Sequence, residues 1–543
     1  MRSEKFTSAY IGLMLTAFIL FTGPGGYVLL ARKKFIFFAV LTSIWAVAVL
    51  VSILKEKNTV LDRREGMTGG KSGEDLPLVP DGSASPASGD GRSEQHSCGF
   101  SRSAGRHSCG FSRSAGRHSC GFSRSAGRNR RQADLESSRL SSLIRIPPVL
   151  KFTVLYVILC TVSTLASEHP VFFGFGTGRY NGLATYLLYG VIFAGVYLYG
   201  RLEEWHLLAF FGAASVCSII VLLQYAGLDP LKLYPDGLDF RSPYIQQVYL
   251  FLGTLGNVDI LSSLNCLAIP ASICSFTHIS PKRRFVPVIS AVLGLGSAFA
   301  ASVQSGWLAL AATLTVYLYI QIIVQKKDKK SSARKLQELS LCKAPSEPTD
   351  CPELSQCMET CEQCGCRNLK EHAFESDRKD RLHLFLPAAV LALLAAACFI
   401  AVFILPGEAG SSRIIIWKSS LEVFREHPVL GIGPDCLSDY SDVVFKRFSQ
   451  ELGRELSTAC DNAHCELLHH LVSFGIAGLI PLAGAAVSVS KNISSHFLAP
   501  AVFCYAVQSF FNLGLPIVTP VFIIFLALCS RESSSFQQDN MIE

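Results

Sequence analysis

Charged residues are scarce in this 543-residue chain: Asp, Glu, Lys and Arg make up 17% of it, and 50% is hydrophobic. A soluble domain carries about a quarter charged residues, so a soluble globular domain is excluded. The charges stand in a few blocks between long apolar runs, and a membrane-spanning helix needs about 20 mostly apolar residues. Buried strands, at about 4–8 residues, are too short for these runs. We therefore predict an all-α polytopic membrane protein.

Several common motifs are also missing. The sequence has no P-loop, no acidic pair with the character of a metal site and no defensible Ser-His-Asp arrangement. The 19 cysteines are scattered through apolar runs and two polar loops, which is not the pattern of a disulfide scaffold. No A-x-A-like cleavage site follows the first apolar stretch, so we interpret that stretch as a spanning helix. The net charge of +7 does not predict nucleic acid as a partner, because basic residues beside apolar runs set membrane topology.

About twelve apolar runs have the length of a membrane span. We predict spans at residues 7–26, 35–54, 149–167, 183–200, 205–224, 255–276, 285–302, 306–325, 383–405, 464–486, 496–512 and 514–530.

The basic loops predict the orientation of these spans. Loops 55–148, 279–284 and 326–382 carry clusters of Lys and Arg and fall on one side if the spans alternate. The positive-inside rule makes that side the cytoplasm. We therefore predict a multi-pass protein of the cytoplasmic membrane with both termini in the cytoplasm. The basic segment 31–34 is the one misfit, since it lands outside. The expected outer features are the GTGRYNG turn, loop 225–254 and loop 406–463.

The chain then divides into seven predicted segments. They are two spans (1–54), a disordered basic cytoplasmic loop (55–148), spans three to eight (149–325), a Cys-rich cytoplasmic loop (326–382), span nine (383–405), a large extracytoplasmic loop (406–463), and three spans with the tail (464–543).

Two cytoplasmic features leave a metal alternative open. HSCGFSRSAGR stands three times in residues 96–128, and its Gly and Ser content favours a duplicated disordered linker over a metal site. Six cysteines in residues 342–366 have spacings short enough for Zn²⁺, although they do not form a paired C-x2-C knuckle.

The outer loop contains a predicted surface helix. From Arg413 to Glu426, helical periodicity places Trp417, Leu421 and Phe424 on one face, which suits a helix at the membrane surface with its Trp at headgroup depth. Pro428 ends the helix, and the glycines that follow predict a tight turn. A plain interfacial strut explains the same pattern.

The segment Asp461–Ile480 is the second candidate. Asp461 or the following Asn can cap a helix, which would place His464 in its first turn. Gly475 lies 11 positions after His464, on the same helical face, where it would permit close helix packing. The deeper His469 and His470 are functional candidates because ionisable groups are costly in a membrane, although ordinary polar contacts would explain them equally well.

Arginines are the third candidate set. Arg179, Arg241 and Arg413 all fall on the predicted outer side. Three guanidiniums suit a diphosphate, because Arg stays charged and binds phosphate oxygens in pairs.

These motifs resemble the O-antigen ligase and polymerase family of membrane glycosyltransferases. The most specific similarity runs through R-x3-W at Arg413 and Trp417, then HPVLGIGPD, then DNAHCELLHHLVSFGIAGLI. The opening PGGYVLLARKKF is similar to members from Gram-positive bacteria. Three positions depart from the family pattern: Cys465 replaces the usual Asn, Asn257-Val258-Asp259 replaces Asn-Pro-Asn, and Gln304-Ser305 replaces a Ser-Arg pair.

The resemblance implies a GT-C-like, metal-independent transferase without a cofactor. Its donor would be a glycan on undecaprenyl diphosphate, and its acceptor a lipid, glycan or protein. By position in the motifs, Arg413 and His464 would be catalytic, while Arg179, Arg241 and Trp417 would bind substrate. Ligase and polymerase are not separable, and capsule, exopolysaccharide or wall-polymer synthesis would all fit. The alternative is a transporter or flippase of the same pathway.

Overall fold

The structure is a computed structural model, and it describes residues 2–68, 146–168, 175–176, 178–234, 251–341, 408–449, 454–493 and 496–531. The chain divides into two units, Met1–Leu54 with Pro147–Glu543, and Lys55–Ile146. Most of the second unit lies outside the described residues, as do the 11-residue repeats, the Cys-rich segment 342–366 and the predicted span 383–405. The seven predicted segments therefore stay a prediction.

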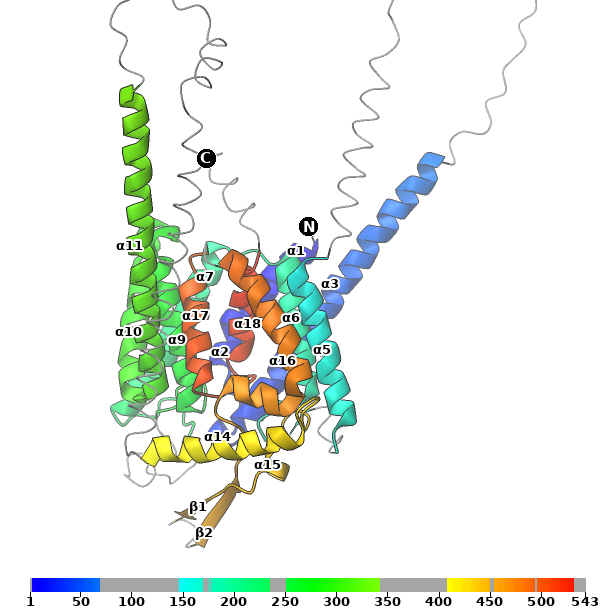
Figure 1. Ribbon diagram of the computed structural model, residues 1–543, viewed down its shortest axis with the longest axis vertical. Helices are drawn as coiled ribbons and strands as arrows, with labels where there is room; N and C mark the ends of the chain where they lie inside the picture. Colours follow the sequence, from blue (N-terminus) through cyan, green and yellow to red (C-terminus); the bar gives the residue numbers. More distant parts are fainter. Residues whose placement is uncertain are drawn as a thin grey trace, which may run out of the picture. The chain divides into compact units, whose positions relative to one another are not determined.

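Helices make up most of the first unit (Figure 1). They are α1 (Arg2–Leu15), α2 (Ala17–Leu20), α3 (Leu30–Thr68, which continues into the second unit), α5 (Pro148–Ala166), α6 (Leu183–Tyr199), α7 (Glu204–Tyr225), α9 (Val258–Cys274), α10 (Phe285–Ala301), α11 (Gln304–Leu341), α14 (Glu408–Glu426), α15 (Leu437–Tyr440), α16 (Glu466–Ile493), α17 (Ala499–Phe510) and α18 (Thr519–Cys529), with short 3-10 turns at Gly26–Leu29, Phe276–His278 and Pro281–Arg283.

Within the described residues, six helices are long and apolar enough to cross a membrane, and four shorter ones are also apolar. The helical multi-pass architecture is thereby confirmed, whereas the number of twelve spans stays a prediction. The core contains fully buried aromatic side chains, and Phe210 of α7 meets Phe525 of α18 with ring centroids 5.1 Å apart. The intramembrane cysteines Cys160, Cys217, Cys266, Cys504 and Cys529 are buried, as expected of small apolar side chains.

The first predicted span is broken, and one residue of the basic segment that did not fit the topology is buried at the break. A break at Thr16 separates α1 from α2. Lys34 of α3 is fully buried, and its Nζ donates to the carbonyl oxygens of Phe18 and Ile19 at 2.7 and 2.9 Å. These carbonyls at the end of α2 have no helical partner of their own. Lys34 is therefore a helix cap inside the protein and says little about the side of the membrane.

Contacts group the loops at two ends of this unit. At one end, Ser280 Oγ donates to Glu204 at 2.7 Å, and the ring of His278 stacks on Phe497 at 4.1 Å. At the other, Arg179 pairs with Asp461. Helix α6 joins the two ends, since it begins just after Arg179 and ends just before Arg201. This grouping is what alternating spans predict, while the cytoplasmic side of the termini stays a prediction.

Helix α14 runs across one end of the helical bundle, and a hairpin extends beyond it (Figure 1). Strands β1 (Val444–Ser449) and β2 (Arg454–Ala459) pair in antiparallel register, with Val444 opposite Ala459. This hairpin adds a small β element to the predicted all-α fold. The predicted helix after Arg413 and its end before Pro428 are confirmed.

The packing face of α14 differs from the predicted one. Ile416, Ser420 and Val423 are buried, whereas Leu421, which was expected beside Trp417, is 41% exposed. The buried face of α14 is therefore shifted by one residue from the predicted face. Contacts with α16 and with the 430–437 segment set this rotation of the helix.

Candidate functional site

The glycine turn after α14 and the glycine in α16 form one structural unit. Helix α16 is interrupted at Gly475, where φ is 63° and ψ is −166°. Ile432 N donates to Val472 O at 3.0 Å, on one side of the break, and Ile476 N donates to Pro428 O at 3.0 Å, on the other. The turn thus supplies the hydrogen bonds that the break removes from the helix.

Only glycine fits at the two points of closest approach. A Cβ atom at Gly475 would overlap the carbonyl group of Val429, and one at Gly431 (φ 70°) would overlap the backbone of Val472 and Ser473. Both residues also have left-handed backbone conformations, which other residues adopt only with strain. The sequence-based role of Gly475 as a smooth packing surface on a continuous helix is therefore wrong.

Two serines, one in the last turn of α5 and one capping its C-terminus, hold this unit in place. Ser163 Oγ lies 2.5 Å from the carbonyl oxygen of Leu430 and 2.9 Å from that of Ser473. Ser167 Oγ donates to the carbonyl oxygen of Ile432 at 2.8 Å. These contacts join α5, the turn and α16 into a rigid support for the segment that carries His464.

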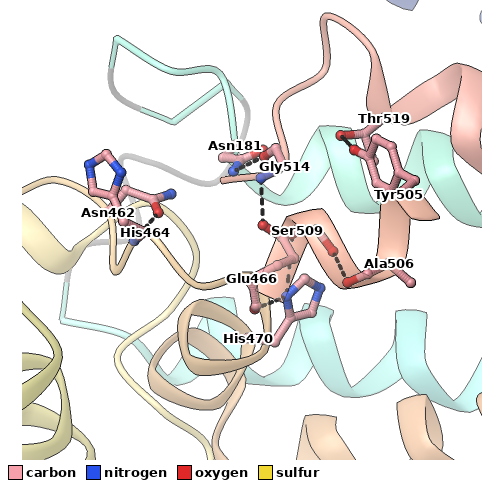
Figure 2. Close-up of polar contacts among 10 residues, drawn as sticks. All are labelled: Asn181, Asn462, His464, Glu466, His470, Tyr505, Ala506, Ser509, Gly514 and Thr519. Carbon is pink, nitrogen blue, oxygen red and sulfur yellow. Dashed lines mark hydrogen bonds and ion pairs between the residues drawn. The ribbon is translucent and has the colours of Figure 1, made fainter. Parts of the chain in front are cut away.

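The sequence predicted His464 in the first turn of α16. In the structure, His464 lies two residues before this helix begins. Its φ of 48° is left-handed, and its backbone N–H donates to the side-chain oxygen of buried Asn462 at 2.9 Å (Figure 2). Asn side chains favour such local turns. The turn holds His464 in this strained backbone conformation and so sets the direction of its imidazole. Strained residues of this kind concentrate at functional sites.

Arg179 reaches the same place from the loop before α6. Its Nε lies 2.5 Å from Oδ2 of Asp461, and the two side chains are 26% and 32% exposed. The carboxylate engages only the Nε of the guanidinium. Within the described part of the chain, the two terminal nitrogens therefore remain available to phosphate oxygens. Asp461 therefore acts as an anchor for Arg179, rather than as the simple helix cap suggested by the sequence.

The charges around His464 keep its imidazole neutral. Burial, the largest cause, and the cations of Arg179 and Arg413 together lower its pKa to about 4, while Asp259 and Asp461 oppose them. A histidine with this pKa is neutral at pH 7 and can accept a proton. The structure thus brings Arg179, Arg413 and His464 together, as the sequence predicted.

The other two predicted site residues differ in placement. Arg241 lies outside the described residues. Trp417 packs half-buried, one turn from Arg413, against the apolar cluster beneath the outer loop. Its packing helps to hold α14 in position, and its contact with a substrate stays a prediction. The cluster consists of Ile416, Val423, Ile432, Cys436, Leu437, Cys460, Ala463 and Val472.

The sequence reasoning missed a polar connection behind the site. Asn181 Nδ2 donates to the carbonyl oxygen of Gly514 at 3.1 Å, and Gly514 N donates to Glu466 Oε2 at 2.7 Å (Figure 2). Glu466 lies 3.5 Å from Nδ1 of His470, one helical turn on. An acid four residues before a histidine within an apolar run was the available sequence signal.

Asp259 is a second acid that the sequence reasoning did not assign to the site. Asn257 caps α9 and accepts from the N–H of Asp259 at 2.7 Å. Gln508 donates to the carbonyl oxygen of Asp259 at 3.3 Å. The helix start is therefore tied to the 508–514 region, close enough for Asp259 to influence His464.

Among the described residues, no group of three or more His, Cys, Asp or Glu side chains could hold a metal ion. The arrangement that is present suits other chemistry. Guanidiniums can bind an anionic leaving group and stabilise the charge that develops on it, and a neutral imidazole can accept a proton from a hydroxyl.

One comparison with known proteins identifies this region. The model of the O-antigen ligase family matches residues 376–483, which contain Arg413, Trp417, the glycine turn and His464. No curated protein matches the chain. The match supports a membrane glycosyltransferase function in glycan assembly, and it confirms the resemblance seen in the motifs. Through this segment, the chain is similar to the O-antigen ligase family.

Proposed function

We propose that this protein transfers a glycan from undecaprenyl diphosphate to an acceptor hydroxyl at the outer face of the cytoplasmic membrane. The observation that carries the proposal is His464, held in a left-handed turn three residues from Asp461, the ion-pair partner of Arg179, and within electrostatic reach of Arg413. A base and two cations at one point suit a reaction in which a proton leaves the nucleophile and negative charge grows on a leaving group.

In the proposed reaction, the acceptor oxygen attacks the anomeric carbon of the donor sugar. The new glycosidic C–O bond forms as the bond from that carbon to the diphosphate oxygen breaks. His464 takes the acceptor proton, and the polyprenyl diphosphate leaves with the electron pair of the broken bond. Arg179 and Arg413 bind its oxygens, and Arg241 is the proposed third ligand. Asp461 holds Arg179 in the orientation that this binding requires.

The test is a transfer assay with a synthetic polyprenyl-diphosphate oligosaccharide and the purified full-length protein in vesicles, with EDTA present. The matched variants are Arg413→Ala and Arg425→Ala, because both arginines lie on α14 and Arg425 points to solvent. We expect transfer by the wild type and by Arg425→Ala, and a loss of at least about a hundredfold in Arg413→Ala.

Product length separates the two forms of the reaction. A ladder of products indicates a polymerase, and a single addition indicates a ligase. If the folded wild type transfers nothing to lipid, glycan or protein acceptors, the proposed reaction is wrong, and transport of the same lipid-linked glycan becomes the better explanation. If EDTA abolishes transfer, metal independence is wrong.

A further inference from the structure

A large apolar cavity lies behind the site, among α5, α6, α11, α16, α17 and α18. Its volume is about 1610 Å³, well above the roughly 300–1,000 Å³ of a pocket for a drug-sized ligand. Its walls include α6 from Tyr186 to Phe193 and extend to Arg201, just beyond the end of that helix. At ~1.5 Å per helical residue, this is a length of roughly 20 Å. That is more than half of the ~30 Å hydrocarbon core of a membrane. The cavity therefore has the size and lining for a long hydrocarbon chain.

The cavity has a polar end next to the candidate site, formed by Glu466 and His470. Nδ1 of His470 lies 2.8 Å from the carbonyl oxygen of Glu466 and 3.5 Å from its carboxylate. Both acceptors face Nδ1, so this nitrogen carries the proton, and Nε2 is an acceptor without a partner among the described residues. The imidazole packs against the rings of Tyr156 and Tyr186, with centroid distances of 6.0 and 5.7 Å.

Tyr186 adds unused hydrogen-bonding capacity at this end. Its hydroxyl is buried, and no partner for it occurs in the part of the chain that the structure describes. Buried polar groups are nearly always hydrogen-bonded. A carboxylate, an imidazole nitrogen and a phenol hydroxyl together offer donors and acceptors that match the hydroxyl groups of a sugar or an alcohol.

The distribution of charged side chains indicates different binding places for the anionic donor head and for an uncharged head. Glu466 and the neighbouring tyrosines offer no fixed cation to a diphosphate, so the anionic donor head belongs with Arg179 and Arg413. The polar end of the cavity is nevertheless adjacent, because Gly514 bonds to both Glu466 and Asn181, and Asn181 stands two residues from Arg179. A neutral head placed at Glu466 and His470 would therefore lie beside the donor site.

We propose that this cavity binds the acceptor, an amphiphile with a long hydrocarbon chain and an uncharged, hydroxyl-bearing head. The chain fills the space between α6, α16 and α17, and the head bonds to His470 and Glu466. The acceptor role rests on the proposed glycosyl transfer, whereas binding of the amphiphile does not. An anionic lipid with its head at Arg201 and Arg531, at the far end of the cavity, is the competing occupant; Arg201 already lies 4.0 Å from Glu4.

The test uses a hexadecyl glucoside that carries a photoreactive diazirine beside the sugar, added to the full-length protein in lipid nanodiscs. Crosslinks are located by mass spectrometry. We expect them in the peptides around Glu466–His470 and Tyr186. Ala485→Trp places a bulky side chain in the cavity wall, while Ala483→Trp lies on the exposed face of the same helix. The first variant should lose the crosslink, and the second should keep it.

Binding strength gives a second readout. His470→Phe and Glu466→Gln should bind the glucoside about tenfold more weakly, through loss of hydrogen bonds to the head. Binding of polyprenyl diphosphate should change less than about twofold in Ala485→Trp, which also shows that this variant is folded.

Three results would overturn the proposal: crosslinks that persist in Ala485→Trp, crosslinks centred on Arg201 and Arg531, or displacement of the probe by an anionic phospholipid but not by an unlabelled glucoside. The proposed function fails separately. If the crosslinks occur as expected but no acceptor receives a glycan, amphiphile binding stands and the transferase proposal does not. If transfer occurs without these crosslinks, the cavity proposal alone is wrong.

Discussion

The backbone N–H of Ile432 donates to the carbonyl oxygen of Val472 across a distance of 3.0 Å, and this bond places the glycine turn inside a break in a membrane helix. The break at Gly475 frees carbonyl and amide groups that a membrane interior would leave without water. The turn at residues 428–433 pairs with them, so two motifs separated by about 40 residues in the sequence act as one support beneath His464.

Gly475→Ala should therefore destabilise the protein and reduce transfer. The residue has a φ of 63°, and a Cβ atom would overlap the carbonyl of Val429. Strain of this kind costs about 1–3 kcal/mol, and any shift of the turn also moves His464. Thermal unfolding in detergent measures the first effect, and the transfer assay measures the second.

Gly212→Ala is the matched control, since Gly212 lies in α7 and an added Cβ would meet no atom within 4 Å. It should unfold at or slightly above the wild-type temperature. Equal melting temperatures for Gly475→Ala and the wild type would show that the turn does not depend on glycine.

Lys34→Met should lower stability without changing the site directly. The side chain is fully buried and donates to the carbonyl oxygens of Phe18 and Ile19. Methionine has a similar shape but no donor, so the carbonyl oxygen of Phe18 loses its hydrogen bond, at a cost of about 1–3 kcal/mol, while that of Ile19 still accepts from Thr254 Oγ1 at 2.8 Å. The measurement is the midpoint of thermal unfolding. Arg32→Met removes an exposed cation from the same helix and should leave the midpoint within about 1 °C of the wild type; a similar drop in both variants would refute the capping role.

Much of the helical framework could be predicted from apolar periodicity, because a membrane span needs a long apolar run whatever its neighbours are. The surface helix after Arg413 and its end before Pro428 followed in the same way. The break at Gly475 could not be predicted from periodicity, since the helix breaks there only because a distant turn supplies the missing hydrogen bonds. A glycine in an apolar helix looks the same whether it packs or breaks.

The candidate site likewise contains residues that the sequence predicted and contacts that it did not. Arg179, Arg413 and His464 could be singled out because ionisable groups beside apolar segments are costly and conspicuous. The ion-pair partner of Arg179 could not be predicted, since Asp461 lies 282 residues further along the chain. Glu466 was overlooked because its role depends on the backbone of Gly514, a contact that sequence spacing does not encode.

Asp461→Asn should weaken donor binding more than it affects folding. The Asn side chain keeps the shape of Asp but loses the charge that holds the Nε of Arg179. Charge-assisted hydrogen bonds are roughly twice as strong as neutral ones, so we expect about a tenfold rise in the donor KM with a smaller change in kcat. Asp442→Asn, at an exposed position of the outer loop, is the control.

A double-mutant cycle tests whether the two residues act together. Arg179→Ala and Asp461→Asn combined should cost little more than Arg179→Ala alone, since the carboxylate acts through the arginine. Fully additive losses in kcat/KM would mean that Asp461 has a separate role.

The pH dependence of transfer should reveal the environment of His464. Burial, Arg179 and Arg413 lower its pKa to about 4, and the imidazole accepts a proton only while it is neutral. It is neutral above its pKa, so wild-type kcat/KM should stay level from pH 7 to about 5 and fall as the pH drops through about 4. An ordinary histidine would instead lose activity near its usual pKa of 6.5.

Removal of a nearby cation should shift the acidic limb of the pH profile, the pH range in which kcat/KM falls, to higher pH. In Arg413→Ala, the residual activity should fall at a higher pH than in the wild type, because loss of a positive charge makes protonation of His464 easier. The limb should remain below 6.5, since burial, the larger cause, is unchanged. Arg425→Ala should leave the limb in place. A wild-type limb near 6.5, in protein shown by its melting temperature to be folded at that pH, would mean that the group that titrates during transfer is not the buried His464.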